Sequence, residues 1–419
     1  MLDAGLAHQA EVLLGRNDPS PSASVSFTYI CLMPEPIYLD HAATTPVRAE
    51  VLEAMLPFYG PKFGNPSSVH RWGRDARTAL DEARERVARC IGATADEICF
   101  TSGGTEADNI AILGTWRARR GEGRRGIVTT PIEHKAVLET VHQAASEGAE
   151  ERLCRMTADG VVDVDSFRAL LGSDTSIASV MWVNNEIGTI QPIEELAAAS
   201  KAAGALFHTD AVQAFGKVHV DARAVPFDVL SISGHKIGAP KGIGAVFIRR
   251  GTVIEPLFHG GSQDRGRRPG TENVAAVIGF ARAAELAVAE REAHWQHFEA
   301  MRVRLEEAIL ARVPDAVIHG RGAARRAPHI ISISVPGIES ESMLMALDLR
   351  GIGCSAGSAC QSGSVSPSHV LDAIGVSPDL AGAAIRMSIG SLTTDEAIDR
   401  VAQVFPALVE KARGVARVS

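Results

Sequence analysis

Short apolar runs alternate with helical patterns along the first two thirds of the chain. The runs are EICFTS (97–102), GIVTT (126–130), SIASVMWV (176–183), ALFHTD (205–210), VLSIS (229–233) and GAVFIRR (244–250). Most of them are apolar at successive positions, which predicts strands that are buried on both faces. Such strands, separated by helices, are typical of a mainly parallel sheet wrapped by helices. The pattern therefore predicts an α/β domain whose ligands bind beyond the carboxyl ends of the strands.

Helical patterns lie between the apolar runs: one begins at Glu106, and two cover residues 134–145 and 193–204. A further helix is predicted over residues 44–55. There, Thr45 is suited to the N-cap and Pro46 to the first helical position.

The C-terminal third predicts a second, smaller domain. Its first helical stretch contains the apolar segment 274–289, but Arg282 and Glu285 within that segment indicate an amphipathic helix rather than a membrane span. The segment HIISISVP (329–336) adds a strand. We therefore expect a large domain over residues 46–293 and a small α+β domain formed by residues 34–45 and 294–419.

Composition narrows the classes of protein that fit. At 419 residues the chain exceeds a single ordinary core, and its net charge of −8 argues against a nucleic-acid or membrane-surface protein. Residues 1–33 lack the features of a signal or transit peptide, so we expect a disordered N-terminal extension, with Met33 as an alternative start. The six cysteines show no CxxC pair, so no metal site or disulfide framework is predicted, and a reducing cytoplasm is the expected location.

Four of the six cysteines have ordinary structural interpretations, and Cys360 does not. Cys90, Cys99 and Cys154 lie in helical or apolar patterns and are expected to be inert core residues, whereas Cys31 belongs to the N-terminal extension. Cys360 lies in GSACQSGS (357–364), where Gly and Ser predict a loop that can bury little. A cysteine in such a loop is unusual, because cysteine is among the most buried residue types.

Three features of the large domain follow the ends of predicted strands. The segment TSGGTEADN (101–109) offers approachable backbone N–H groups at a helix start, Asp210 follows one strand, and Lys236 follows another. Taken singly, they fit a plain glycine turn and a structural ion pair. Taken together, they supply what pyridoxal phosphate needs: a phosphate cradle, a lysine for covalent attachment and an acid for the ring nitrogen.

The chain also resembles a known family through motifs that occur in the order seen in cysteine desulfurases of the NifS and IscS group. These motifs are YLDHAATTP (38–46), TSGGTEADN (101–109), EHKAV (133–137), VNNEIG (183–188), HTDAVQAFGK (208–217), SGHKIGAPKGIGA (233–245), RRPGTEN (267–273), GSAC (357–360) and AIRMSIG (384–390). The resemblance runs from about residue 37 to about residue 400. Gly104 stands where alanine is frequent, Pro269 stands where a small residue is common, and Cys354 is not expected from the family.

The resemblance implies fold type I of the pyridoxal phosphate enzymes, which is the aspartate-aminotransferase fold, in a homodimer. By motif, Lys236 resembles the lysine that attaches the cofactor, Asp210 the partner of the pyridinium nitrogen, Gln213 the partner of the ring oxygen, and His134 the residue stacked on the ring. Gly104, Thr105, Ser233 and His235 match the phosphate cradle, and Thr271 matches a threonine contributed by the other subunit. Asn185 and Arg386 are expected to bind the substrate carboxylate, and Cys360 to accept sulfur.

The implied reaction converts L-cysteine to L-alanine and leaves a persulfide on Cys360, for transfer to an iron–sulfur scaffold or to tRNA thiolation. Because the nucleophile is a thiolate, its pKa must be lowered or its proton removed, and Arg386 and a protonated His134 are the candidates. Cys354 is expected at the edge of the loop, where it could exchange sulfur with Cys360. A selenocysteine lyase and an aminotransferase are alternatives of the same fold. A non-catalytic sulfur or metal carrier is disfavoured, because Lys236 and Asp210 are both present.

Overall fold

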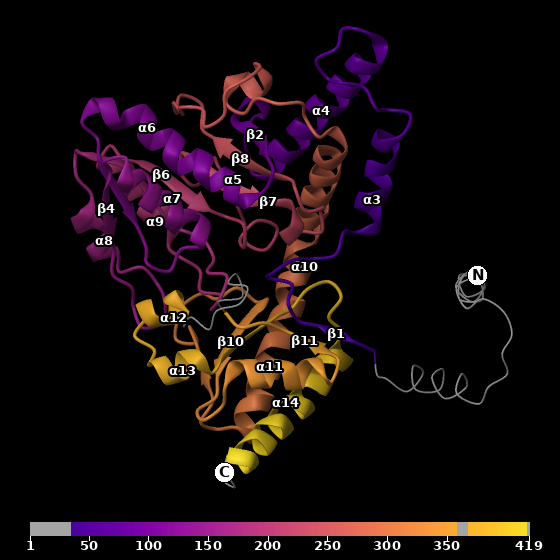
Figure 1. The fold of residues 1–419 in the computed structure, drawn as a ribbon, viewed down its shortest axis with the longest axis vertical. Helices are drawn as coiled ribbons and strands as arrows, with labels where there is room; N and C mark the ends of the chain where they lie inside the picture. The colour runs from indigo at the N-terminus through magenta and orange to yellow at the C-terminus, as the bar shows by residue number, and fades with distance from the viewer. Residues whose placement is uncertain (1–34, 358–367, 417–419) are drawn as a thin grey trace, which may run out of the picture. The chain divides into compact units, whose positions relative to one another are not determined.

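The largest sheet in the computed structural model has seven strands. The structure describes residues 35–357 and 368–416. In sheet order the strands are β2 (Ile98–Thr101), β8 (Gly244–Ile248), β7 (Val229–Ser233), β6 (Leu206–Asp210), β5 (Thr175–Ser179), β3 (Gly126–Thr129) and β4 (Glu150–Leu153). Within this sheet β8 pairs antiparallel with both neighbours, and the other pairs are parallel. The predicted mainly parallel sheet is therefore confirmed (Figure 1).

Each of the six predicted runs coincides with one of these strands to within one residue at its start, whereas β4 was not predicted. Strand β4 reads Glu-Glu-Arg-Leu and is half-buried to exposed at one edge of the sheet, so it shows no apolar pattern. An edge strand rich in charge discourages pairing with other chains.

The helices around the large sheet lie on both of its faces. They are α3 (Ala49–Met55), α4 (Arg71–Cys90), α5 (Gly104–Asn109), α6 (Thr115–Arg119), α7 (Lys135–Ser146), α8 (Val164–Leu170), α9 (Ile193–Ala202) and α10 (Val274–Arg312), with a π-helical turn η3 (Ile110–Gly114) that joins α5 to α6. Short 3-10 turns are η1 (Leu56–Tyr59), η2 (Ala95–Glu97), η4 (Arg120–Glu122), η5 (Gly234–Lys236) and η6 (Gln263–Gly266).

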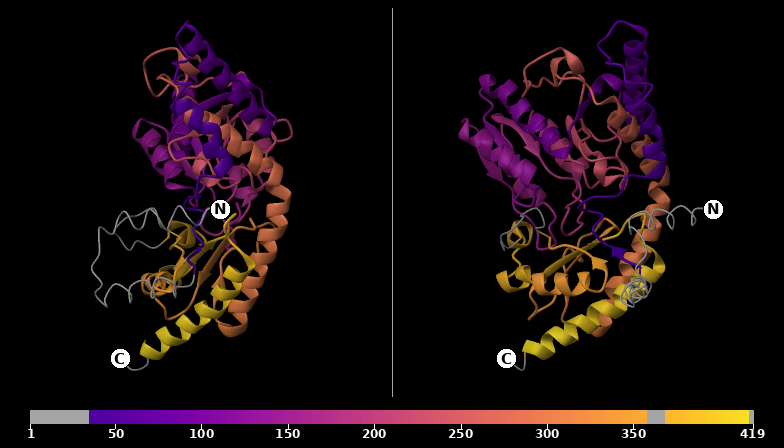
Figure 2. Two further views of the ribbon diagram at one scale, coloured as in Figure 1. Left: turned by 90° about the vertical axis from the view of Figure 1, so that its right-hand side faces the viewer. Right: turned by 45° about the vertical axis from the view of Figure 1, so that its right-hand side comes forward.

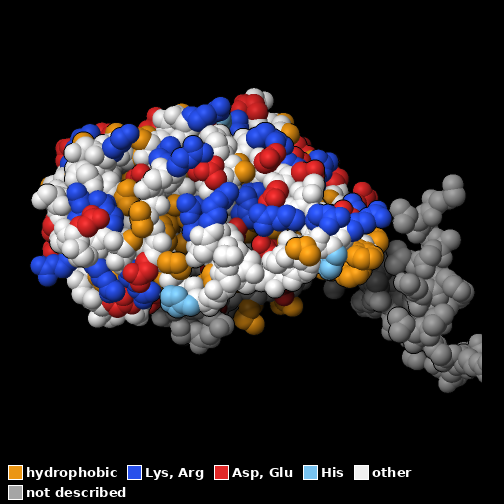
Figure 3. Space-filling model, turned by 90° about the horizontal axis from the view of Figure 1, so that it is seen from above, with side chains coloured by type: hydrophobic (Ala, Val, Ile, Leu, Met, Phe, Trp, Pro, Cys, Tyr) orange, Lys and Arg blue, Asp and Glu red, His pale blue; other side chains and the backbone are white. Residues whose placement is uncertain are grey.

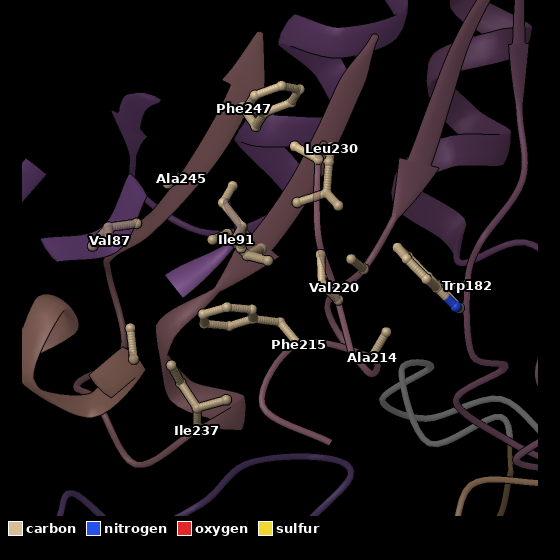
Figure 4. Packing of buried hydrophobic residues seen from close by; sticks show 14 of the residues in the cluster. Val87, Ile91, Trp182, Ala214, Phe215, Val220, Leu230, Ile237, Ala245 and Phe247 are labelled. Atoms are coloured by element: carbon tan, nitrogen blue, oxygen red, sulfur yellow. The ribbon is translucent and has the colours of Figure 1, made fainter. Parts of the chain in front are cut away.

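Side chains of successive strand residues enter different cores. In β8, Ala245 and Phe247 belong to the large core beneath α4 and α10, whereas Val246 and Ile248 belong to the core beneath α5 to α7. Figure 4 shows Leu230 beside Phe247, with Phe215 and Val220 in the same large core. Burial on both faces explains why these strands read as continuous apolar runs.

One predicted helix start is wrong. Helix α3 begins at Ala49 with Arg48 as its N-cap, so Thr45 caps no helix there. Instead, the backbone N–H and the hydroxyl of Thr45 both donate to the carbonyl oxygen of His235, at 2.9 Å each. The hydrogen bonds of Thr45 are therefore made to a residue distant in sequence, and not to the first turn of α3 as the local sequence predicted.

The smaller part of the fold, formed mostly by C-terminal residues, holds two smaller sheets. Antiparallel strands β12 (Ala384–Ser388), β10 (Ile330–Ser334) and β9 (Val317–Ile318) form one, and parallel strands β1 (Ile37–Tyr38) and β11 (Ile352–Gly353) form the other. The remaining helices are α11 (Ser340–Asp348), α12 (His369–Ala373), α13 (Pro378–Gly382) and α14 (Asp395–Ala416).

Helix α10 runs along both parts of the fold (Figures 1 and 2). Its first half packs on α3 and α4, and its second half packs on α14 and β10. The small part has its own core, to which Phe298 and Leu305 of α10 contribute. The domain limits given above stay a prediction.

Charges of both signs are interspersed over the surface. On the face shown in Figure 3, Lys and Arg side chains lie among Asp and Glu side chains, with apolar side chains between them. Among the helices in the described ranges, none is long and apolar enough to cross a membrane.

Candidate active site

A pocket of about 260 Å³ lies at the carboxyl ends of the parallel strands. Because parallel strands end at one edge of a sheet, residues far apart in sequence meet there. Of the predicted site residues, the pocket lining includes Gly104, Thr105, His134, Asn185, Asp210, Gln213, Ser233, His235, Lys236 and Arg386. The structure therefore brings ten of the twelve predicted residues to one cavity.

Lys236 ends the turn η5 that follows β7, and its amine is held by the N-terminal motif. Its Nζ donates to the carbonyl oxygens of Ala42 and Ala43, at 2.6 and 2.7 Å. Gln213 Nε2 donates to the same Ala42 oxygen at 2.9 Å. The YLDHAATTP motif therefore supplies acceptors that place the amine at the pocket.

Asp210 ends β6 and is almost completely buried, with 5% of its surface exposed. Burial raises the pKa of Asp210 to about 6, while the N–H of Val212, which donates to Oδ1 at 2.8 Å, and the charge of Lys236 act in the opposite direction. A buried carboxylate is stable only beside a cation or a strong donor. Asp210 is therefore suited to hold a protonated ring nitrogen.

Asp108, which was not among the predicted residues, lies beside Asp210 in the lining. Burial and then the charge of Asp210 raise the pKa of Asp108 well above its usual value. Its Oδ1 lies 3.6 Å from Nε2 of His208, whose pKa burial lowers to about 3. Of this pair, Asp108 holds its proton more strongly, and Asp210 is the group better suited to carry the negative charge.

The phosphate cradle predicted after β2 has the expected small residues and hydroxyls. Gly104 begins α5, and a Cβ atom there would lie 2.9 Å from Cγ2 of Val212, so a larger residue would crowd the end of β6. Thr105 and Ser233 place hydroxyls in the same lining. Helix N-terminal N–H groups and hydroxyls together suit a phosphate group.

His235 lies at this end of the pocket and is held by the first motif. Its Nδ1 lies 3.2 Å from the hydroxyl of Thr44. Burial, and then the charges of Lys236 and two further lysines, lowers the pKa of His235 to about 4. The ring is therefore neutral at pH 7.

His134 is the N-cap of α7, where its Nδ1 accepts a hydrogen bond from the N–H of Ala136 at 3.1 Å. Burial is the largest cause that lowers the pKa of His134 to about 4, followed by the charges of Lys236 and His369. The low pKa leaves the ring neutral at pH 7, which disfavours His134 and favours Arg386 among the two candidates for lowering the pKa of the Cys360 thiol. A neutral ring can stack on a flat cofactor.

Arg386 of β12 lines the pocket, and Asp40 fixes the orientation of its side chain. Its Nη2 donates to Asp40 Oδ1 and to Ser355 Oγ, at 2.9 and 2.8 Å, and its Nη1 donates to the carbonyl oxygen of Asn185 at 3.0 Å. Its Nε is buried without a hydrogen-bond partner. The guanidinium is thus fixed in orientation and retains a donor, as a site for a substrate carboxylate requires.

Two predicted residues remain. Cys360 lies outside the described residues. Thr271 is exposed, two residues before Asn273, the N-cap of α10, and is not in the pocket lining. Its predicted role across a subunit contact stays a prediction.

The other described cysteines have protonated thiols. Burial raises the pKa of Cys90 to about 11 and the pKa of both Cys154 and Cys354 to about 12, and it also raises that of Cys99. Cys354 packs against the small core and is only half-buried. A thiol that holds its proton is a poor nucleophile, which disfavours sulfur exchange by Cys354.

The pocket fits pyridoxal phosphate in its donor set. It offers an amine on Lys236, a buried carboxylate on Asp210, and a hydroxyl-rich cradle with a glycine where a Cβ would crowd the wall. The sequence analysis did not identify Asp40 and Asp108 as site residues. Their position inside the first two motifs was the feature of the sequence that pointed to them.

Comparison with known proteins gives the class of protein. The sequence matches the aminotransferase class-V family over residues 37–401. The chain belongs to this family of pyridoxal-phosphate-dependent enzymes, and the predicted fold type I is confirmed.

Relatives give the particular group. The chain is 46% identical over 383 residues to the cysteine desulfurase IscS of Dictyoglomus turgidum, covering 91% of this chain and 97% of that protein. It is 45% identical to the cysteine desulfurase NifS of Azotobacter vinelandii, covering 90% and 94%. A solved NifS-like protein superimposes with a TM-score of 0.84 at 37% identity, covering 90% of this chain and 99% of that one. Within the class-V family, the chain falls among the cysteine desulfurases.

Proposed function

We propose that this chain converts L-cysteine to L-alanine and moves the sulfur atom to Cys360 as a persulfide. The observation that carries the proposal is the pocket that unites Lys236, Asp210 and Arg386 from three separate motifs. The similarity to cysteine desulfurases over nine tenths of the chain supports the same reaction.

The residues have distinct roles in the first half of the reaction. Arg386, with Asn185 beside it, binds the carboxylate of L-cysteine, and Asp40 keeps the guanidinium in place. When bound, pyridoxal phosphate supplies a conjugated ring that stabilises the electron pair left by the substrate Cα–H bond. Lys236 attaches the cofactor and then carries the Cα proton, while Asp210 holds the proton of the ring nitrogen.

The remaining lining residues bind and orient the cofactor. Gln213 is held by Ala42 and is proposed to donate to the ring oxygen. His134 is proposed to stack on the ring. The cradle of Gly104, Thr105, Ser233 and His235 is proposed to bind the phosphate, with Thr271 of a second subunit.

Transfer of sulfur from the substrate to Cys360 requires no external oxidant. The thiolate of Cys360 attacks Sγ of the substrate, so the new S–S bond forms as the substrate Cβ–Sγ bond breaks. The electron pair of the broken bond stays with the substrate carbon and takes up a proton, which gives L-alanine. Cys360 keeps the transferred sulfur until an acceptor removes it.

We also propose a homodimer that passes sulfur to an iron–sulfur scaffold or to tRNA thiolation, in a reducing compartment such as the cytoplasm. Large apolar side chains are exposed along one stretch of sequence: Leu52, Leu56, Tyr59, Phe63, Val69 and Trp72. Exposed apolar residues gathered in this way are typical of a protein interface. The reducing compartment keeps Cys360 a free thiol between turnovers.

The test is an intact-mass measurement of the holoenzyme after L-cysteine is added without reductant, followed by peptide mapping. One added sulfur atom on Cys360 is expected. Cys360→Ser should keep bound pyridoxal phosphate and its spectral change with L-cysteine, yet form no persulfide. Sulfide release by Cys360→Ser at the native rate would refute the role of Cys360.

A second test concerns Lys236, and Lys236→Ala should lose the covalent attachment of the cofactor. Borohydride reduction of the wild-type holoenzyme should label Lys236, and label on another lysine would contradict the assignment. An unchanged mass, with the cofactor bound and reacting, would favour an aminotransferase. A strong preference for L-selenocysteine over L-cysteine would favour a selenocysteine lyase.

A further inference from the structure

Glu186 carries a buried carboxyl group beside the pocket that the reaction above does not use. It is 3% exposed and directly follows Asn185. Asn184 fixes this turn, because its Oδ1 accepts hydrogen bonds from the N–H groups of Glu186 and Ile187 at 2.9 and 3.0 Å. The Glu186 side chain therefore starts from a rigid backbone.

The hydroxyl of Ser368 is one partner of this carboxyl group. Ser368 Oγ donates to Glu186 Oε2 at 2.5 Å and accepts from the N–H of Leu371 at 3.2 Å. Ser368 is thus the N-cap of α12 and is 3% exposed. Glu186 holds the residue at which the chain enters α12.

Gly357 packs against the same carboxyl group from the other side of the sequence gap. It is buried, and a Cβ atom at this position would lie 2.5 Å from Glu186 Oε2 and 3.2 Å from Cδ. The backbone of Gly357 therefore lies directly on the carboxyl group. One side chain contacts both positions that flank residues 358–367.

This junction is continuous with the residues proposed to bind substrate. Arg386 donates to the carbonyl oxygen of Asn185, next to Glu186, and to the hydroxyl of Ser355, two residues before Gly357. Cys360 follows Gly357 by three residues.

We propose that Glu186 is a positioning residue, whose carboxyl group fixes the two flanking positions, Gly357 and Ser368, and thereby sets the rate of sulfur transfer to Cys360. This inference rests on the proposed function. A nucleophile tethered at both ends has a high effective concentration at its target, and loss of one anchor lowers it. Binding of L-cysteine is expected to persist without this anchor, because the hydrogen bonds that hold Arg386 go to Asp40, Ser355 and the Asn185 carbonyl oxygen and not to Glu186.

The experiment separates the two half-reactions in the holoenzyme. Stopped-flow absorbance follows the response of bound pyridoxal phosphate to L-cysteine, and quenched mass measurement follows the persulfide on Cys360. In Glu186→Ala and Ser368→Ala the first rate should be unchanged. The second rate should fall between about tenfold and hundredfold, because misplacement of a reacting group on the order of 1 Å can slow a step about hundredfold.

Two further variants test the contacts themselves. Glu186→Gln keeps the size and an acceptor oxygen, so it should recover part of the rate lost in Glu186→Ala. Gly357→Ala should slow persulfide formation because its Cβ meets the carboxyl group. In the double variant with Glu186→Ala that clash is gone, so the two effects should not add.

Ser342→Ala is the matched control, because the hydroxyl of Ser342 donates to Glu339 at 3.4 Å in an exposed pair away from the pocket. Wild-type rates are expected for Ser342→Ala. Persulfide formation at the wild-type rate in Ser368→Ala, equal losses in both half-reactions, a Glu186→Gln rate as low as that of Glu186→Ala, or additive effects in the double variant would each overturn the inference. If the wild type itself forms no persulfide, the proposed function fails instead.

Discussion

Burial, more than residue type, sets the chemistry of single side chains in this pocket. Burial raises the pKa of the Asp210 carboxyl group to about 6 and lowers the pKa of the His134 ring to about 4. An exposed aspartate and histidine have pKa values near 4 and 6.5, in the opposite order. Buried groups that need partners mark sites where a charged ligand fits.

The first prediction concerns Asp210. In Asp210→Asn, pyridoxal phosphate should still bind, but the turnover number with L-cysteine should fall about 10- to 100-fold, since a hydrogen bond to a charged group contributes about 1.5–3 kcal/mol. Steady-state kinetics with the cofactor content measured in parallel checks this.

Asp228→Asn is the matched control for Asp210→Asn. Asp228 is a half-buried carboxylate that, like Asp210, accepts a hydrogen bond from a backbone N–H, that of Phe207 at 2.8 Å, and it does not line the pocket. Its variant should keep full turnover. Equal turnover in the Asp210 and Asp228 variants would exclude a charged role for Asp210.

Elements contribute by where they end. Strands β6 and β7 stop at Asp210 and Ser233, and His134 is the N-cap of helix α7, so three elements deliver side chains to one edge. The positions of the buried strands along the chain could be predicted, because burial on both faces leaves an apolar run. The exposed strand β4 and the true start of α3 could not, because the local sequence at Thr45 favours a cap that a distant carbonyl oxygen overrides.

The small three-stranded sheet carries a prediction on pH. His319 follows β9, and its Nε2 lies 2.7 Å from the hydroxyl of Ser334 on β10, which itself donates to Leu380. Burial lowers the pKa of His319 to about 4. Between pH 6.5 and 4 the unfolded chain therefore binds a proton at this position that the folded chain does not, so the folded state loses stability as the pH falls.

His319→Gln should remove this contribution. Between pH 7.5 and pH 5 the free energy of unfolding of the wild type should fall by about 2 kcal/mol more than that of the variant. Urea unfolding of both proteins at the two pH values measures the difference. The same pH dependence in both proteins would show that folding does not lower the pKa of His319.

At the scale of the whole molecule, the proposed dimer completes the site. The described chain places Thr271 outside its own pocket, next to the start of α10. The exposed apolar side chains between Leu52 and Trp72 are suited to a subunit interface. In the proposed dimer, the second subunit contributes its Thr271 to the pocket. Each active site would then need two chains.

Hybrid dimers test this arrangement. Lys236→Ala and Thr271→Val homodimers should both turn over L-cysteine poorly. A hybrid with one chain of each kind should regain about half of the wild-type rate per dimer, because one of its two symmetry-related sites has both residues intact. Co-expression with two different tags gives the hybrid, and no regained activity would place Thr271 in the site of its own chain.

The sequence by itself determined the α/β class, the positions of the buried strands, and the motifs that gather ten predicted residues in one pocket. These follow from local periodicity and from the order of short motifs, which need no knowledge of contacts. Only the tertiary structure decided that Ala42 and Ala43 hold the Lys236 amine, that Asp40 orients Arg386, that His134 is neutral, and that Gly357 and Ser368 meet at Glu186. The physical reason is that burial and hydrogen bonding between residues hundreds of positions apart arise from packing, which leaves no local signal in the sequence.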